Sequence, residues 1–295
     1  MRSEGPVVSV VVPVLNESHV IERCLDSLAA QDTRHEYEIL VVDNGSTDDT
    51  VTRARGYSRV RVLHQEGTLG RARQTGLEQA RGEYVAFLDA DEVAVNSWLS
   101  HLIKVAEVHG AAVGPVLPLK ASGKVADYFQ IAHQMHSIHY TERIVSGRIV
   151  TFGAGNLIVK RAMALSVGFD SMFPTGEDGD FSYRWLRTGF GLGFSEDARV
   201  FHDLPSSLGG MYVYHRKLSF GLGLLARKHH DAVFIRLYLV SLLYPMSPPF
   251  ARRFRSVAGR EALGLLPLGM LEALAYAIPP RSLVCSSGPP DRRRH

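Results

Sequence analysis

The sequence has little cysteine, since only Cys24 and Cys285 occur among its 295 residues. They lie far apart, and neither belongs to a CxxC pair or to the spacing of a zinc site. This scarcity argues against a disulfide-bonded scaffold and against cysteine-bound zinc. Cys24 falls in an amphipathic pattern, so we interpret it as a small core residue. A reducing cytoplasm therefore fits the chain better than secretion does.

A long uninterrupted apolar run is also lacking. Near the amino terminus, Pro13 and Asn16 interrupt the apolar stretch and no small-residue cleavage site follows, so we expect no export signal. Near the carboxyl terminus, residues 237–251 are broken by three prolines and residues 262–280 contain a glutamate. Neither segment has the roughly 20 consecutive apolar residues of a clean membrane-spanning helix.

The sequence contains nearly equal numbers of positively and negatively charged residues. With 33 Lys and Arg against 30 Asp and Glu, the net charge of +3 is too small to indicate a nucleic-acid binder. The balance hides an asymmetry, because residues 1–203 carry 20 basic and 26 acidic side chains whereas residues 204–295 carry 13 basic and 4 acidic ones. We therefore expect two regions with different partners, divided near residue 204.

The basic region 204–295 has two interpretations. Arg252, Arg253, Arg255 and Arg260 lie between its apolar segments, as in interfacial helices held against anionic lipid headgroups. The alternative is a pair of helices that packs on the amino-terminal part or forms a homodimer interface. We prefer the first interpretation, which predicts a peripheral protein on the cytoplasmic face of a membrane.

Strands and helices alternate through the acidic region. Buried β-branched runs predict strands, and apolar residues at helical spacing, as after Ser18, predict the helices between them. Ser18 is a candidate cap for the first helix, and residues 45–47 are a turn and cap before the second. The expected strands are residues 7–14, 38–43, 60–64, 84–88, 111–116 and 151–159, and the expected helices are residues 20–29, 48–57, 70–80, 96–109 and 176–187.

Such an alternation predicts an open α/β sheet that binds ligands beyond the carboxyl ends of its strands. Asn16, Asp43 and Asp89 each follow a predicted strand, so we expect them at one edge of the sheet, in a polar cleft. His133, His136 and His139 share one helical face, which we interpret as a polar surface rather than a metal site.

Three clusters of acidic and polar residues are candidates for binding or catalysis. Asp89 and Asp91 lie in a tight turn, and hard carboxylate oxygens of this kind hold Mg²⁺ or Mn²⁺. The Asp43-Asn44 pair offers hydrogen-bond acceptors to a base edge, and Glu177-Asp178 begins a helix, where the dipole keeps a carboxylate ionised. The alternatives are a surface turn for the first cluster and ordinary helix capping for the other two.

These clusters belong to a longer series of blocks, in which the sequence resembles the family 2 glycosyltransferases, inverting enzymes of the GT-A fold. The blocks occur in family order between about residues 7 and 203: VVSVVVPVLNES, EILVVDNGSTDDT, GRARQTGLEQARGEYVAFLDADE, FGAGNLIVKR, VGFD and GEDGDFSYRWLRTGF. The resemblance implies a Rossmann-like open mixed sheet flanked by helices, followed by a mostly helical carboxyl-terminal extension. It divides the core into a nucleotide-binding half, residues 1–116, and an acceptor and base half, residues 117–203.

The resemblance assigns a donor site to matching positions. It implies that a nucleotide sugar, expected to be UDP-linked, contacts Pro13, Asn16, Glu17, Asp43, Asn44, Arg73 and Asp89, with Asn156 and Gly155 lining the sugar pocket. The chain departs from the usual pattern at Asn44, where many members have Asp, and at Gln74, where many have Asn, which puts the identity of the base in doubt.

The resemblance also assigns the reaction. Asp91 and Asp89 match the carboxylates that hold Mg²⁺ or Mn²⁺, and His202 matches a position that supplies a further metal contact in some relatives, with a buried structural histidine as its alternative. Asp178 matches the general base, and Glu177 orients the acceptor or the sugar.

Processive relatives carry a Gln-x-x-Arg-Trp motif that this sequence lacks around residues 215–217. We therefore expect a single-addition enzyme that acts on a lipid-linked or cell-envelope acceptor and binds no nucleic acid. The alternatives are a soluble natural-product or peptide acceptor and a non-catalytic subunit that binds sugar nucleotides.

Overall fold

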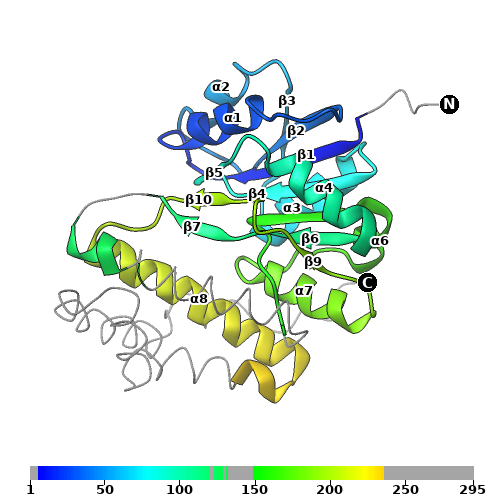
Figure 1. The fold of residues 1–295 in the computed structure, drawn as a ribbon. Helices are drawn as coiled ribbons and strands as arrows, with labels where there is room; N and C mark the ends of the chain where they lie inside the picture. Colours follow the sequence, from blue (N-terminus) through cyan, green and yellow to red (C-terminus); the bar gives the residue numbers. More distant parts are fainter. Residues whose placement is uncertain (1–5, 120–122, 129–130, 132–148, 236–295) are drawn as a thin grey trace, which may run out of the picture.

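The computed structural model describes residues 6–119, 123–128, 131 and 149–235, and it is built around one seven-stranded sheet (Figure 1). Across the sheet the order is β3 (Val60–His64), β2 (Tyr37–Asp43), β1 (Val8–Val14), β4 (Tyr84–Leu88), β8 (Asn156–Lys160), β6 (Ala111–Val113) and β9 (Gly193–Phe194). The first four of these strands are parallel to one another, whereas β8 runs antiparallel to both of its neighbours.

Strand β1 lies at the centre because its side chains are apolar on both faces, and all seven of its residues are buried. Pro13 of β1 lacks a backbone N–H, whereas the residues of a central strand normally use this group to pair with a neighbouring strand. The pairing of β1 with β4 ends at Val11 and Phe87, whereas the pairing with β2 continues to Asp43. The proline therefore lies where β1 has already left one of its two neighbours.

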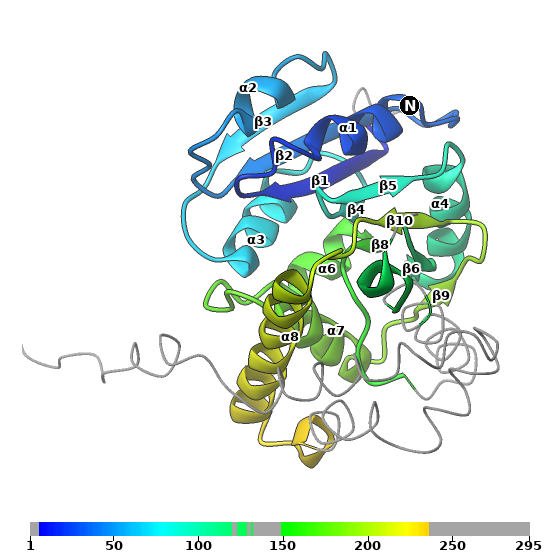
Figure 2. The same ribbon diagram turned by 90° about the vertical axis from the view of Figure 1, so that its left-hand side faces the viewer.

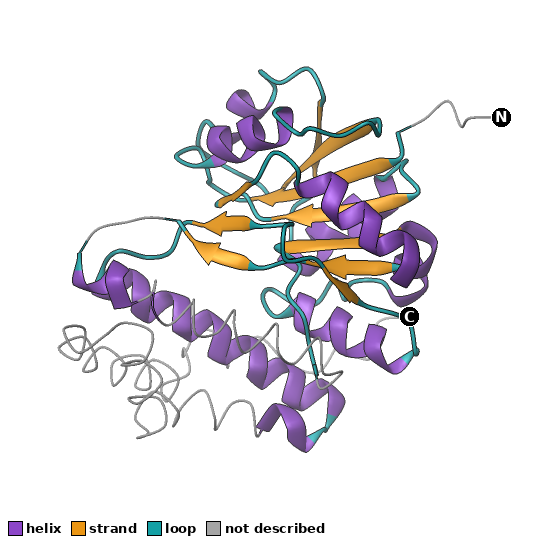
Figure 3. Ribbon diagram, in the orientation of Figure 1, coloured by secondary structure: helices purple, strands orange, loops and turns teal. Residues whose placement is uncertain are grey.

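Helices cover both faces of the sheet, which gives the three layers drawn in Figure 3. On one face, α1 and α4 pack against alternate β1 residues such as Val10 and Val12, and Cys24 is fully buried there. On the other face, α3, α6 and α7 pack around Val11. The helices are α1 (Ile21–Ala29), α2 (Thr50–Ala54), α3 (Leu69–Gln79), α4 (Trp98–His109), α6 (Arg161–Val167) and α7 (Glu177–Arg187).

A second, three-stranded sheet adjoins the edge where the parallel strands end. Its strands are β5 (Glu92–Ala94), β10 (Val200–His202) and β7 (Val116–Pro118), with β10 in the middle. The chain then enters α8 (Leu208–His229), which lies against α7, as seen from the side in Figure 2. None of the helices in the described ranges is both long and apolar enough to cross a membrane.

The predicted open α/β sheet is confirmed, and the ends of β1, β2 and β4 do share one edge because the three strands are parallel. The expected cap at Ser18 is wrong, since α1 begins at Ile21 with Val20 as its N-cap and without a side-chain cap. The strand expected over residues 151–159 begins only at Asn156. The histidines at 133, 136 and 139 and the apolar segments 237–251 and 262–280 lie outside the described residues.

We predict that Gly76→Ala destabilises the protein, although alanine normally favours a helix interior by about 1 kcal/mol. Gly76 lies in α3 directly over Val11, and a methyl group there would overlap the Val11 side chain. We expect a net loss of about 1–2 kcal/mol in the free energy of unfolding, measured by urea denaturation.

The matched control is Gly223→Ala in α8, where a methyl group would meet open space, so that variant should be neutral or slightly stabilised. In a Val11→Ala background the Gly76→Ala penalty should disappear. A penalty that persists in that background would contradict the packing explanation.

Candidate functional site

The loop after β1 is tied to the loop after β2 by hydrogen bonds. The Asn16 side-chain oxygen accepts from the Thr47 backbone N–H at 2.8 Å, and the Asn16 backbone N–H donates to the Ser46 hydroxyl at 2.9 Å. Asn16 adopts a left-handed backbone with φ of 58°, which asparagine tolerates better than most residues. The Glu17 backbone N–H donates to the Thr50 hydroxyl at 2.8 Å, so both loops form one wall of the site.

Asp43 and Asn44 end β2 beside that wall. The Asp43 carboxylate accepts from the Ser46 backbone N–H at 2.9 Å and pairs with His64 Nδ1 at 3.1 Å. Burial raises the pKa of Asp43, but these hydrogen bonds outweigh it and hold the pKa below its usual value. Asn44 donates from its amide to the Gly67 carbonyl, while its buried side-chain oxygen has no hydrogen-bond partner among the described residues. That oxygen is suited to accept from a base N–H.

The turn after β4 carries Asp89 and Asp91. Buried Glu92 supports this turn by accepting from the Asp89 backbone N–H at 3.1 Å. His202 on β10 meets it from the opposite side, with 3.1 Å between its Nε2 and an Asp91 carboxylate oxygen. The side chains of Asp89 and Asp91 are each 37% exposed, so both carboxylates remain open to a ligand.

Arg73 connects this turn to the start of α7. Its guanidinium, only 3% exposed, forms ion pairs with Asp89 and with Glu177. Arg73 lies in α3, so one buried cation joins three elements that are distant in sequence. A planar guanidinium with five donors is suited to bridging two carboxylates.

Helix α7 begins directly with the two acidic residues. The Asp178 carboxylate accepts from the Gly179 backbone N–H at 2.7 Å and from the Ala154 backbone N–H at 3.4 Å. Glu177 is buried, and its second oxygen has no hydrogen-bond partner within the part of the chain that the structure describes. Asp178 is thus held in place while Glu177 keeps a free acceptor.

The carboxylates crowd one another enough to disturb their protonation. Burial, followed by the charge of Asp91, raises the pKa of Glu17 to about 7, and burial with Asp89 raises the pKa of Glu92 to about 8. Burial lowers the pKa of His202, but the adjacent carboxylates outweigh it and raise the value to about 9. The site therefore concentrates negative charge that a bound cation would offset.

This charge fits a divalent cation held in an open site. The described residues contain no preformed group of three His, Cys, Asp or Glu ligands. They do offer the Asp91 carboxylate and the His202 imidazole 3.1 Å apart, with Asp89 close by. A carboxylate with one imidazole would leave the other ligand positions of a divalent cation to water or to a bound ligand.

Asn156 takes a structural position in this geometry. Its side-chain oxygen accepts from Trp98 Nε1 at 2.8 Å, and its amide donates to the carbonyls of Ala198 at 2.7 Å and Pro115 at 3.1 Å. Both amide hydrogens are therefore occupied. A contact between Asn156 and a sugar stays a prediction that this geometry does not favour.

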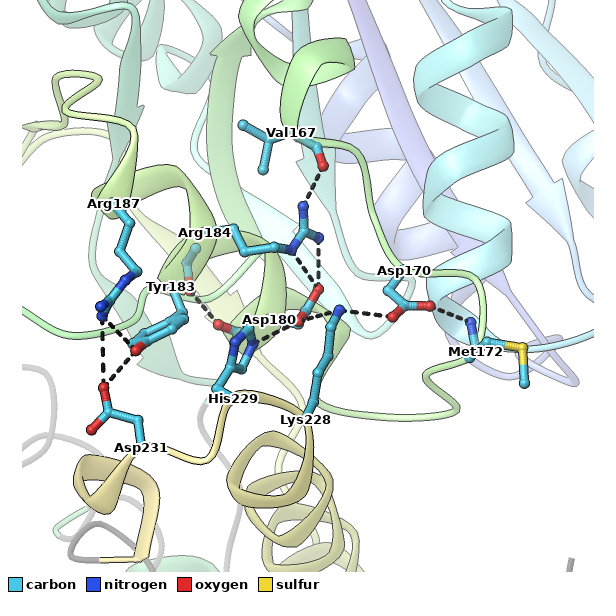
Figure 4. Close-up of polar contacts among 12 residues, drawn as sticks. Val167, Asp170, Met172, Asp180, Tyr183, Arg184, Arg187, Lys228, His229 and Asp231 are labelled. Carbon is cyan, nitrogen blue, oxygen red and sulfur yellow. Dashed lines mark hydrogen bonds and ion pairs between the residues drawn. The ribbon is translucent and has the colours of Figure 1, made fainter. Parts of the chain in front are cut away.

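Asp180, one turn into α7, is a neighbour of the site that the sequence analysis did not single out. It is fully buried and accepts from Arg184 on its own helix, and from Lys228 and His229 at the end of α8, at 2.6–2.9 Å (Figure 4). Lys228 also pairs with Asp170 at 2.7 Å. This network holds α7, and with it Asp178, against α8.

Helix α8 confirms the expected helical character of the carboxyl-terminal extension, and it reaches the site at two points that the sequence did not predict. The Tyr214 ring lies 6.4 Å from the His202 ring, centroid to centroid. Gly221 packs on Gly176, the residue immediately before Glu177, so closely that a Cβ on Gly221 would lie 3.2 Å from the Gly176 Cα. The pair of glycines was the available signal, since close backbone approach needs the smallest residue.

Comparison with known proteins shows what the chain is similar to. The model of the Glycosyl transferase family 2 matches residues 9–167. Glycosyltransferase AglE of Haloferax volcanii is 32% identical over 225 residues, which cover 69% of this chain and 71% of AglE.

Two solved structures share the fold. Mannosyltransferase PcManGT from Pyrobaculum calidifontis, in complex with GDP-Man and Mn²⁺, has a TM-score of 0.64 at 21% identity, covering 93% of this chain and 87% of that one. S. aureus TarS 1-349, in complex with UDP-GlcNAc, has a TM-score of 0.56 at 19% identity, covering 91% and 89%. At these identities the likeness shows the fold.

We predict that Asn156→Ala lowers the free energy of unfolding by about 2–4 kcal/mol, because it removes the partner of the Trp98 N–H and of the Ala198 carbonyl, whereas the Pro115 carbonyl keeps its bond from the Val200 N–H. Urea denaturation followed by Trp fluorescence measures this loss. A fully stable variant that had lost only affinity for a sugar ligand would instead support the sugar-pocket role.

We predict a pH-dependent loss in Asp180→Asn. Burial raises the pKa of Asp180, but hydrogen bonds from Arg184 and Lys228 outweigh it and lower the pKa below 3.8. A lowered folded-state pKa stabilises the protein above the unfolded-state pKa, and this contribution is lost as the pH falls through the folded-state value. At pH 7 the variant should lose about 3 kcal/mol relative to wild type.

That difference should shrink as the pH is lowered below about 4, because the wild-type carboxylate then becomes protonated as well. Asp231→Asn is the matched control, since Asp231 joins the same two helices through Tyr183 at 2.5 Å but is only partly buried. It should lose less stability. An Asp180→Asn penalty that stays constant with pH would contradict the electrostatic explanation.

Proposed function

The chain belongs to glycosyl transferase family 2 and is a glycosyltransferase, and from this premise we propose that it transfers a single sugar from a nucleoside diphosphate sugar to an acceptor hydroxyl with inversion. The observation that carries the proposal is the buried Arg73, which ties the Asp89 turn to the Glu177-Asp178 helix start. A donor-binding turn and a base are thereby held in one site.

The donor occupies the wall formed by the loops after β1 and β2. We assign the base to the region of Pro13, Asn16 and Asn44, where the unpartnered Asn44 oxygen supplies an acceptor. Glu17, Asp43, Arg73 and Asp89 complete the nucleotide contacts. The structural relatives bind GDP-Man in one case and UDP-GlcNAc in the other. We propose a UDP-linked sugar, with Asn44 in place of the commoner Asp as the position that decides between bases.

Asp178 accepts the proton of the attacking hydroxyl. Its carboxylate is oriented by the N–H groups of Gly179 and Ala154, at the first turn of α7. Attack occurs on the anomeric carbon from the face opposite the leaving diphosphate, so the configuration inverts. Glu177, through its free oxygen, orients the acceptor or a sugar hydroxyl.

A divalent ion, Mg²⁺ or Mn²⁺, fits the residues present. Asp91 and His202 would hold it, with Asp89 alongside. When bound, it would neutralise the charge of the leaving diphosphate. The neighbour's Mn²⁺ supports this assignment for a shared fold.

For the acceptor we propose a lipid-linked or cell-envelope glycan. The support is the basic composition of residues 204–295 and the exposed apolar side chains of α8, namely Leu208, Val213 and Leu218. With such an acceptor, we propose that the protein acts at the cytoplasmic face of a membrane. A soluble acceptor is the second candidate, because α8 packs on α7 as part of the catalytic unit.

The test of the proposed base is Asp178→Asn. Turnover with the identified donor should fall by about 10²–10⁴-fold, because the neutral amide cannot accept the proton. Donor binding should persist, and a thermal-shift screen of UDP- and GDP-sugars with Mn²⁺ measures it, since a ligand specific for the folded state raises the apparent stability.

Asp91→Asn is the complementary variant, expected to lose Mn²⁺-dependent donor binding. Product NMR reports the anomeric configuration. Turnover of Asp178→Asn at the wild-type rate, or a product with retained configuration, would refute the proposed mechanism.

A further inference from the structure

Lys217 lies on α8 between the two points where this helix touches the site. Three residues before it, the Tyr214 ring lies 6.4 Å from the His202 ring. Four residues after it, Gly221 packs against Gly176. Seven helical residues rise about 10 Å, so this stretch of α8 spans the distance from the metal side of the site to its base side.

Lys217 lies beside the buried face of α8, which is formed by Met211, His215, Ser219, Gly221 and Leu225. Residues three, four and seven apart share one face of an α-helix, so Tyr214, Lys217 and Gly221 lie in one row. Arg216, in contrast, lies on another face and engages Tyr212, donating to its hydroxyl at 3.1 Å. Two adjacent cations on α8 therefore differ in direction, and only Lys217 belongs to the row that meets the site.

The charge of Lys217 acts on the site's carboxylates. It lowers the pKa values of both Asp91 and Glu17, although burial and neighbouring carboxylates leave the pKa of Glu17 raised overall. Lys217 is exposed, and across the described ranges its ammonium forms no hydrogen bond or ion pair. Lys217 is thus a cation beside the acidic cluster, and the N–H groups of its ammonium are still available to a ligand.

We propose that Lys217 binds the diphosphate group of the donor and stabilises it as it leaves. The inference rests on the proposed function and names a residue that the family blocks ending near residue 203 do not include. As the bond from the anomeric carbon to the diphosphate oxygen breaks, the electron pair stays on that oxygen, and a second cation beside the metal position offsets the charge. An ammonium serves such a phosphate as a mobile point charge.

The experiment compares Lys217→Gln with Arg216→Gln, which removes the same charge one residue away on the other face. Isothermal titration of UDP and GDP in Mn²⁺ should show about tenfold weaker binding for Lys217→Gln, the value of one lost charge-assisted hydrogen bond. Binding of uridine and guanosine should not change, because they carry no phosphate. Lys217→Arg should retain most of the affinity, and Arg216→Gln should match wild type.

A titration with Mn²⁺ alone distinguishes substrate contact from general charge balance. Removing Lys217 leaves the carboxylates more negative, so Lys217→Gln should bind Mn²⁺ as tightly as wild type or more tightly. Diphosphate binding and Mn²⁺ binding are therefore expected to move in opposite directions. A parallel loss of both would indicate distortion of the site and would overturn the proposal.

The proposal would also be overturned if Lys217→Gln bound UDP and GDP as tightly as wild type does. That result would point to a phosphate on the acceptor as the group that Lys217 binds. This failure is distinct from failure of the proposed function. If wild type bound neither UDP nor GDP in Mn²⁺, the glycosyl-donor proposal itself would fall, and the role of Lys217 with it.

Discussion

The pairing of Arg73 with Asp89 and Glu177 holds the site together, because this buried guanidinium lies between two acidic motifs that are distant in the sequence. Arg73 is almost completely buried, and removing one partner of a buried ion pair commonly costs about 3–5 kcal/mol. Its position depends in turn on α3, whose Gly76 lets the helix lie directly on Val11 of the central strand. Core packing thus determines where the one cation between the two acidic motifs lies.

Sequence reasoning succeeded where a local pattern has one structural solution. Runs such as residues 8–14 form strands buried on both faces, and parallel strands bring Asn16, Asp43 and Asp89 to one edge. It failed where the answer depends on distant partners. Ser18 has the side chain of a cap, yet α1 begins at Ile21 and the Ser18 backbone N–H donates to Asp48 instead. Caps and loop contacts of this kind are decided by tertiary packing.

The roles of buried polar groups were equally hidden from the sequence. Asn156 follows a glycine in a family block and reads as a pocket residue, but its amide is used by Trp98 and two backbone carbonyls from other segments. Asp180 reads as part of an acidic helix start, yet Arg184, Lys228 and His229 from two helices converge on it. In both cases the residue type was visible in the sequence, whereas most of its partners, Arg184 excepted, lie tens of residues away.

The contact between Gly176 and Gly221 bears on how related enzymes can exchange segments by recombination. Change in acceptor preference is often imagined as the swapping of a carboxyl-terminal module onto a constant catalytic core. Here the backbone of α8 rests on the residue before Glu177 and Asp178, and the end of α8 is bonded to Asp180. A recombination junction placed before Leu208 would bring together an α7 surface and an α8 surface from different proteins, which are not complementary in shape. A junction beyond His230 would keep α7 and α8 together as one inherited unit.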